Sequence, residues 1–162
     1  MKTSVALVAL LTHTVLLASS SAETYSVTRL DTLLGVKGYI QPTAINNAGS
    51  ILCQFQPTLS SPARATLFRN KQSGNVDLGT LGGTNSIPYD LNALNVAVGF
   101  AENKDGIAHA VVFTPNGLAI EDLGTLDNSI PSLTSVATSI NDDGVVVGQS
   151  YSTPTLYRAT RF

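Results

Sequence analysis

The sequence predicts an all-β protein made of three copies of one repeat, each copy forming four short strands. Three observations lead to this fold class. Three sets of landmark residues recur in the same order and at similar spacing, which is the signature of a repeat architecture. Short runs rich in β-branched residues alternate with Gly, Asn and Asp turns, as in strands and hairpins. Beyond the first segment, no window shows the 3.6-residue periodicity of a helix.

The landmarks are a Leu-x-Thr-Leu element, an Ile/Leu-Asn element and an Arg/His-Ala-x-x-Phe element. The three copies of each begin at Leu30, Leu78 and Leu123, at Ile45, Leu91 and Ile140, and at Arg64, His109 and Arg158. The steps between copies are 45 to 49 residues. We therefore expect repeats over about 25–70, 71–115 and 116–162.

Each copy is predicted to form its strands in a fixed order. The first strand carries Leu-x-Thr-Leu, the second ends at Ile/Leu-Asn, and the fourth carries Arg/His-Ala-x-x-Phe. The third is a run such as 96–100 or 145–148, and because it is continuously apolar we expect it to be buried on both faces. Turns at 47–49, 104–106, 115–117 and 142–144 place Asn, Asp or Gly where a tight hairpin needs positive φ.

Three such units fit two architectures. Propeller-like blades are one reading, although a propeller normally has four to eight blades. A closed pseudo-threefold trefoil or prism is the alternative. If the units instead form an open arc, their free edges favour self-association, so a homo-oligomer is part of this expectation.

The first 22 residues are predicted to be a signal peptide. Lys2 precedes a mostly apolar stretch at 5–17, and Ser20, Ser21 and Ala22 supply the small residues of a cleavage site. The stretch is too short to span a bilayer, and no membrane span is expected after cleavage. Residues 23–162 then form one domain of a secreted protein, extracellular or periplasmic.

Composition and charge argue against a nucleic-acid partner. Charged residues make up 12% of the chain, the formal net charge is −2, and no basic stripe is present. We therefore expect no nucleic-acid partner. The single cysteine, Cys53, cannot form an internal disulfide and lies in an apolar run where other copies have Gly99 and Gly148, so a buried small residue is expected there. No motif indicates a cofactor.

Candidate site residues come from the repeated positions. Arg64, His109 and Arg158 would form a ring of equivalent donors around an axis, suited to an anion or a carboxylate. Asp77 and Asp122 follow the same spacing, and we expect them to cap turns or accept from backbone N–H groups; Asp31 is one place out of register.

Two other patterns carry no site. The run 141–144 (Asn-Asp-Asp-Gly) lacks the spaced carboxylates of a calcium loop and is read as a hairpin turn, so no metal site is predicted. We also predict no catalytic residue.

These elements resemble the HAF family of extracellular repeat proteins, named for a His-Ala-Phe signature. The resemblance is carried by 77–83 (Asp-Leu-Gly-Thr-Leu-Gly-Gly), by 109–113 (His-Ala-Val-Val-Phe) and by 140–148, and it covers essentially all of 23–162. It implies secretion and a repeat β fold, and it carries over no catalytic residue. The chain departs from the pattern in the separation of Ala from Phe and in having Arg64 and Arg158 where the family has His.

The leading functional hypothesis is a secreted, non-catalytic recognition or scaffold module for an extracellular glycan or protein. In such a module the strands form a rigid scaffold and the loops carry the binding residues. The absence of Trp weakens a sugar site that depends on stacking. The alternative is a structural subunit of a surface or envelope assembly. A third hypothesis is a hydrolase whose residues are gathered from separate repeats.

Overall fold

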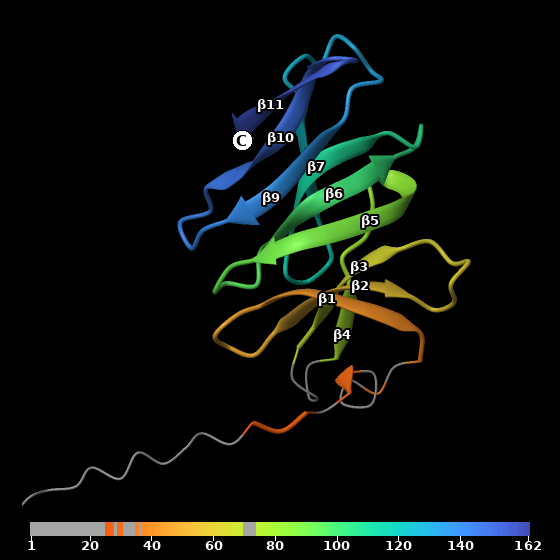
Figure 1. Cartoon of the computed structure of the whole chain (residues 1–162), viewed down its shortest axis with the longest axis vertical. Coiled ribbons are helices and arrows are strands. Elements are labelled where there is room, and N and C mark those ends of the chain that lie inside the picture. The colour runs from red at the N-terminus through yellow and green to blue at the C-terminus, as the bar shows by residue number, and fades with distance from the viewer. Residues whose placement is uncertain (1–24, 28, 31–34, 36, 70–73) are drawn as a thin grey trace, which may run out of the picture.

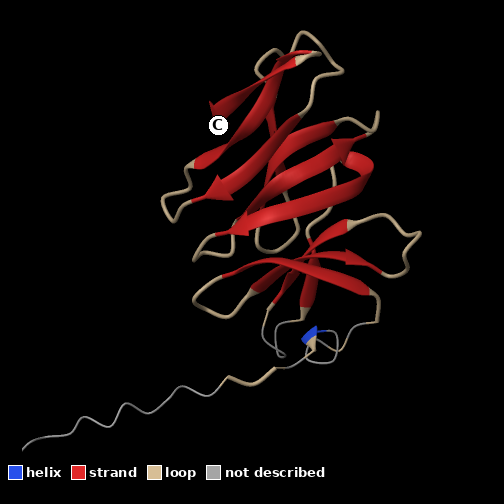
Figure 2. Ribbon diagram, in the orientation of Figure 1, coloured by secondary structure: helices blue, strands red, loops and turns tan. Residues whose placement is uncertain are grey.

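The computed structural model describes residues 25–27, 29–30, 35, 37–69 and 74–162. Eleven antiparallel strands form three open sheets in this part of the chain (Figures 1 and 2). Sheet A contains β1 (Tyr39–Ile45), β2 (Ile51–Gln56), β3 (Arg64–Phe68) and β4 (Asn75–Asp77). Sheet B contains β5 (Gly82–Leu91), β6 (Ala97–Asn103), β7 (Ala108–Phe113) and β8 (Ile120–Gly124). Sheet C contains β9 (Ser135–Ile140), β10 (Val146–Thr153) and β11 (Leu156–Arg161).

The all-β prediction is confirmed. Within each sheet the strands follow one another in chain order and are joined by hairpins. The four predicted turns are also confirmed, since Gly49, Gly106, Gly117 and Gly144 all have positive φ. Glycine has no Cβ and adopts this backbone conformation without steric cost.

The prediction that Leu-x-Thr-Leu forms the first strand is wrong for the second and third copies. Leu78, Gly79 and Thr80 lie outside the strands, between β4 and β5, and Leu123 and Gly124 end β8. The physical reason is the aspartate before the element, which turns the backbone after the fourth strand. Sheet C consequently has three described strands instead of the expected four.

Two predictions about the N-terminal part fall outside the described residues. The signal peptide at 1–22 is one, and the first Leu-x-Thr-Leu element beyond Leu30 is the other. Within the described residues, no helix is long and apolar enough to cross a membrane.

Sheet B lies between sheets A and C (Figure 1), and apolar side chains are buried between neighbouring sheets. Between sheets A and B, the side chains of Leu52, Ala65 and Leu67 pack against Leu91, Ala97 and other residues of sheet B. Between sheets B and C, Val98 and Ala110 pack against Ala137, Ile140 and Val146. Each interior therefore lies between two sheets and requires both of them.

The prediction that the apolar run in each copy is buried on both faces is half right. It holds for β6, in which Ala97, Val98 and Gly99 are all buried. It is wrong for β10, in which Val146 is buried but Val147 is exposed. The reason is that β6 lies between two neighbouring sheets, whereas sheet C has a described neighbour on one side only.

Asparagines after the first strand of each sheet join the sheets to one another. Asn46 Oδ1 accepts from the backbone N–H groups of Ala48 and Ser50, which fixes its own hairpin. Its Nδ2 donates across to the backbone oxygen of Asn92 (3.0 Å). Asn92 repeats this arrangement, since its Nδ2 donates to the backbone oxygen of Asn141 (3.3 Å). One side chain thus shapes a turn and connects it to the next turn.

Serines provide a second set of junction contacts. The Ser86 hydroxyl of β5 accepts from the backbone N–H of Ala65 in sheet A (3.0 Å). The Ser135 hydroxyl of β9 accepts from the backbone N–H of Ala110 (2.8 Å) and donates to the backbone oxygen of Gly124. Both serines are buried, so these bonds satisfy backbone groups that water does not reach.

A carboxylate strengthens the junction between sheets B and C. Asp90 Oδ2 accepts from the Ser139 hydroxyl (2.6 Å) and from the backbone N–H of Ile140 (3.0 Å). Partial burial alone would raise the pKa of Asp90. The bonds from Ser139, Ile140 and Leu91 outweigh burial, so the pKa lies below its ordinary value of 3.8.

The asparagine contact can be tested with a matched pair of variants. Asn103 Oδ1 fixes a hairpin in the same way, by accepting from Asp105 and Ile107 N–H groups, but it makes no bond to another sheet among the described residues. We expect Asn92→Ala to lower the free energy of unfolding by about 2 to 3 kcal/mol and Asn103→Ala by about 1 to 2 kcal/mol. Denaturant unfolding measures both, and equal losses would show that the contact between turns contributes no stability.

The Asp90 contact gives a pH-dependent prediction. We expect Asp90→Asn to lower the free energy of unfolding at pH 7 by about 1 kcal/mol, after allowance for solvent screening. Because the folded chain lowers this pKa, the contribution is complete above the ordinary value of 3.8 and is lost as the pH falls from there through the lower folded pKa. The difference between variant and parent should therefore shrink below pH 3.8. A difference that is constant from pH 7 to pH 2.5 would contradict the carboxylate's role.

Candidate functional site

A basic residue and an aspartate are bonded to each other at matching places in sheets A and B. Arg64 begins β3 and Asp77 ends β4, and the distance from Arg64 Nη2 to Asp77 Oδ1 is 3.1 Å. His109 lies near the start of β7 and Asp122 lies in β8, with 2.9 Å between His109 Nδ1 and Asp122 Oδ2. The sequence spacing predicted the equivalence of these residues but not their pairing.

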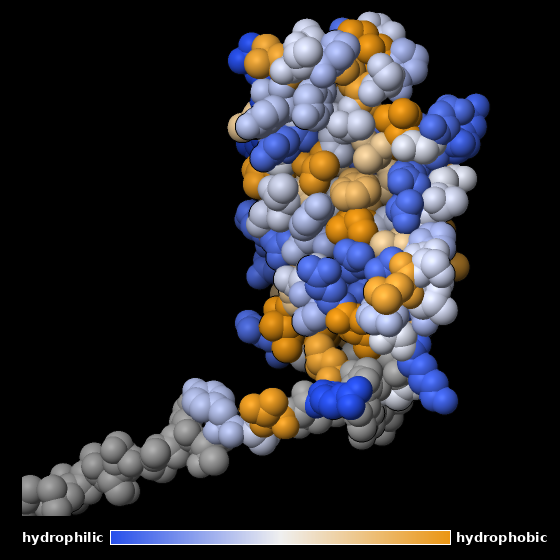
Figure 3. Space-filling model, turned by 45° about the vertical axis from the view of Figure 1, so that its right-hand side comes forward, coloured by the Kyte–Doolittle hydropathy of each residue, from blue (hydrophilic) through white to orange (hydrophobic). Residues whose placement is uncertain are grey.

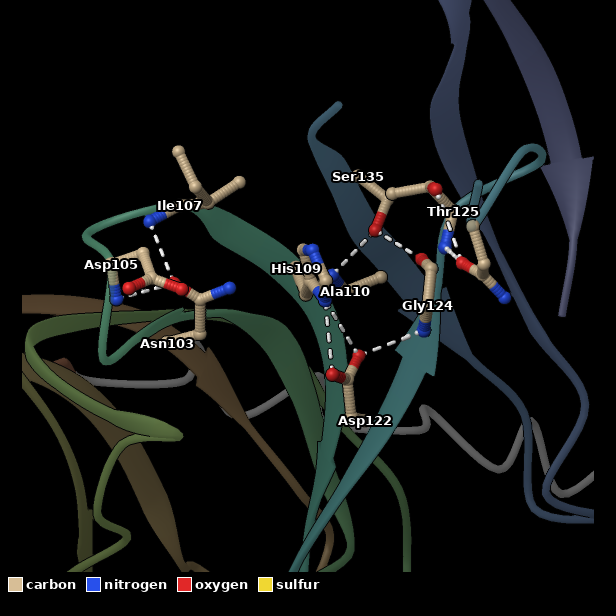
Figure 4. Close-up of polar contacts among 10 residues, drawn as sticks. Asn103, Asp105, Ile107, His109, Ala110, Asp122, Gly124, Thr125 and Ser135 are labelled. Carbon is tan, nitrogen blue, oxygen red and sulfur yellow. Dashed lines mark hydrogen bonds and ion pairs between the residues drawn. The ribbon is translucent and has the colours of Figure 1, made fainter. Parts of the chain in front are cut away.

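The aspartates also turn the chain after the fourth strand. Asp77 Oδ1 accepts from the backbone N–H of Gly79 (2.9 Å), and Asp122 Oδ1 accepts from that of Gly124 (2.8 Å). The prediction that Asp77 and Asp122 accept from backbone N–H groups is therefore confirmed. Figure 4 shows the Asp122 carboxylate between the His109 imidazole and the Gly124 N–H.

The pair in sheet B borders a pocket of about 420 Å³. Its lining is polar and apolar in about equal parts and is formed by Asn103, Asp105, His109, Asp122, Gly124, Thr125, Asn128, Ile130 and Pro131. These residues come from the hairpin between β6 and β7, from β8, and from the segment that leads to β9. The volume lies in the range of small-molecule sites in proteins.

The hydrogen bonds fix the chemistry that this pocket presents. A carboxylate only accepts, so Nδ1 of His109 is the donor to Asp122 and Nε2 is the remaining polar atom of the ring. The Thr125 hydroxyl bonds to Asn128 Oδ1. The Asp105 carboxylate accepts no hydrogen bond from the described residues. The pocket thus offers a carboxylate, an imidazole and amide groups to a ligand.

A nucleophilic mechanism would need a hydroxyl or thiol beside the imidazole. In the part of the chain that the structure describes, no hydroxyl bonds to His109. The nearby Ser135 hydroxyl is buried and engaged with Ala110 and Gly124 (Figure 4). The described His, Cys, Asp and Glu residues also form no group of three suited to a metal ion.

The pocket depends on a longer connection before sheet C. Leu123 precedes Ile140 by 17 positions, whereas Leu78 precedes Leu91 by 13. The additional residues fall in the segment that contributes Asn128, Ile130 and Pro131 to the lining. Sequence reasoning missed these residues, and the uneven spacing between copies was the signal that could have found them.

The three residues of the predicted ring lie on the third strands of separate sheets. Arg64 and His109 are each paired with an aspartate of their own sheet. Arg158 of β11 is exposed and has no carboxylate partner among the described residues. No hydrogen bond or ion pair joins any two of these three side chains in the described structure. A shared ligand at a common axis stays a prediction.

The expectation that Cys53 is a buried small residue is confirmed. Its side chain is fully buried, and burial raises the pKa of the thiol to about 12. At the matching position in β6, a Cβ on Gly99 would lie 2.0 Å from the backbone oxygen of Ile87, so that position requires glycine.

Comparison with protein-family models, with curated proteins and with solved structures gives no match to this chain.

Cysteine chemistry provides a direct check on this packing. Only the thiolate reacts with iodoacetamide, and a buried thiol with a pKa of about 12 stays protonated at pH 8.5. We expect less than one tenth of Cys53 to be modified in the native protein over an hour and complete modification in denaturant, as measured by mass spectrometry. Rapid labelling of the native chain would show that sheet A is open at Cys53.

Proposed function

We propose that this chain is a secreted, non-catalytic recognition module that binds a neutral, hydroxyl-rich ligand, of the size of one or two sugar residues, in the pocket beside His109. The three stacked sheets act as propeller-like blades that hold the binding loops. The predicted signal segment at 1–22 motivates secretion. The resemblance to extracellular HAF repeat proteins supports the same location.

The lining of the pocket is the observation that carries this proposal. Carboxylate and amide groups of Asp105, Asn103 and Asn128 are donors and acceptors suited to hydroxyl groups, and Ile130 and Pro131 supply an apolar side. Two carboxylates near one imidazole disfavour an anion. This charge pattern favours a neutral ligand over the carboxylate that a ring of basic residues would select.

A glycan array, followed by calorimetry with the best ligand, tests the proposal. Asp105→Ala removes a lining carboxylate that makes no described side-chain bond, so the fold should be unchanged. Asp143→Ala is the matched control, since Asp143 is an exposed turn residue outside the pocket. We expect Asp105→Ala to weaken binding by about ten- to a hundredfold, the usual range for a bond to a charged group. The control should bind within twofold of the parent.

Three outcomes would contradict the proposal. An array without signal at high protein concentration would reject glycan recognition. Equal effects of Asp105→Ala and Asp143→Ala would place the ligand elsewhere. Turnover of the bound glycan during incubation would favour the hydrolase hypothesis, and loss of that turnover in Asp122→Asn would assign it to the His109–Asp122 pair.

A further inference from the structure

The two junctions inside the chain use the same positions of the repeat. In β2, Leu52 packs with Leu91 and Ala97 of the next sheet. In β6, Val98 stands at the position of Leu52 and packs with Ile140 and Val146. The matching residue in β10 is Val147, and the matching residues of sheet A are Ile45 and Ile51.

Both ends of the stack expose positions that the inner junctions bury. Val147 is 44% exposed, whereas Leu52 and Val98 are 0% exposed. Ile45 is 68% exposed, whereas Leu91 and Ile140, at the same position, are 6% and 8% exposed. Sheet C thus exposes the apolar position that packs on the following sheet at an internal junction. Sheet A exposes the position that packs on the preceding sheet.

The end of sheet A is hollow as well as apolar. A pocket of about 300 Å³ is lined there by Leu30, Pro42, Thr43, Ala44, Ile45 and Ile51. In Figure 3, hydrophobic residues are among those exposed in the lower part of the molecule, where sheet A lies. An aliphatic side chain such as Val147 fits the chemistry of this pocket.

The polar contacts of the junction are also available at both ends. Asn141 fixes its hairpin through Oδ1, which accepts from Val145 N–H, as Asn46 and Asn92 fix theirs. Its Nδ2 donates to no described residue. The backbone oxygen of Asn46 accepts from Gly49 N–H, which leaves one lone pair for a second donor. At the internal junction, the backbone oxygen of Asn92 accepts from Asn46 Nδ2 in this way.

We propose that the free face of sheet C binds the free face of sheet A in a second copy of this chain, so that two copies close a ring of six sheets. Each Val147 would contact the partner's Ile45 and Ile51, and each Asn141 would donate to the partner's Asn46. Six sheets lie within the four to eight blades of closed propellers. Twofold closure satisfies both ends of both copies and leaves no free junction.

At two positions the residues of this junction differ from those of the internal junctions, and both differences make it weaker. Ile40 stands where β5 and β9 have Ser86 and Ser135, so it supplies no hydroxyl to the backbone N–H of Ala159. Arg161 stands where sheet A has Leu67, so its apolar stem covers the partner while its guanidinium stays at the rim. We therefore expect reversible association that depends on protein concentration.

Light scattering after size exclusion tests the association, with the purified chain over a range of concentrations. We expect twice the chain mass at high concentration. Val147→Asp and Ile45→Asp should each give monomers. Their thermal unfolding should match that of the parent at concentrations where the parent is monomeric, because both side chains are exposed in the single chain. Mixing the two variants should restore a species of twice the chain mass, because one junction of the ring then joins two unmodified faces.

Asn141→Asp tests the polar contact, since it keeps the acceptor that fixes the turn and removes the donor. The dissociation constant should rise by at least about tenfold, because each ring contains two such bonds. Asn103→Asp, at a hairpin with no bond to another sheet, is the control and should leave the constant unchanged.

The proposal is overturned by monomers at every concentration, by larger open polymers, or by a dimer that Val147→Asp abolishes and Ile45→Asp does not affect. The last result would mean that two copies of sheet C pack face to face. None of these outcomes bears on ligand binding at His109, which is measured separately.

Discussion

No sheet of this protein can bury its apolar residues by itself, and this constraint underlies the rest of the structure. The sheets are open and antiparallel, and their interiors form only where one sheet packs on the next. Leu52 and Val98 are fully buried because a neighbouring sheet covers them, whereas Val147 lacks such a neighbour. The hydrophobic effect therefore acts at the junctions, and the stability of each sheet depends on its position in the stack.

Polar side chains at the junctions act within one sheet and between two. Asn92 shapes its hairpin with Oδ1 and bonds the next hairpin with Nδ2. Ser135 belongs to β9, but its hydroxyl bonds to the backbone N–H of Ala110 in β7 and to the backbone oxygen of Gly124 in β8. It thus replaces a direct backbone hydrogen bond between β7 and β8. Because the same residue satisfies both requirements, folding of one sheet prepares the surface on which the next sheet packs. This coupling explains why asparagine follows the first strand of each sheet.

The fold class and the turns could be predicted from sequence because both depend on local chemistry. Glycine at positive φ and β-branched runs report on a few neighbouring residues. The strand that contains Leu78 was predicted incorrectly, because the turn after Asp77 depends on a side-chain bond to Gly79 that composition does not reveal. Most residues of the candidate site could not be predicted from the sequence. The residues around His109 come from three segments, and their convergence is set by how sheet B packs on sheet C.

Residues that recur at matching places in the three sheets and residues that differ between the sheets have different roles in this molecule. Positions that recur, such as Asn46, Asn92 and Asn141, hold sheets together. The pocket forms where the copies differ, at the longer segment before β9 and at the one histidine in a position that Arg64 and Arg158 otherwise fill. An imidazole is shorter than a guanidinium on its stem, so His109 fills less space beside Asp122 than an arginine would. Insertion and substitution together convert a structural ion pair into the wall of a cavity, while the junctions that support it stay the same.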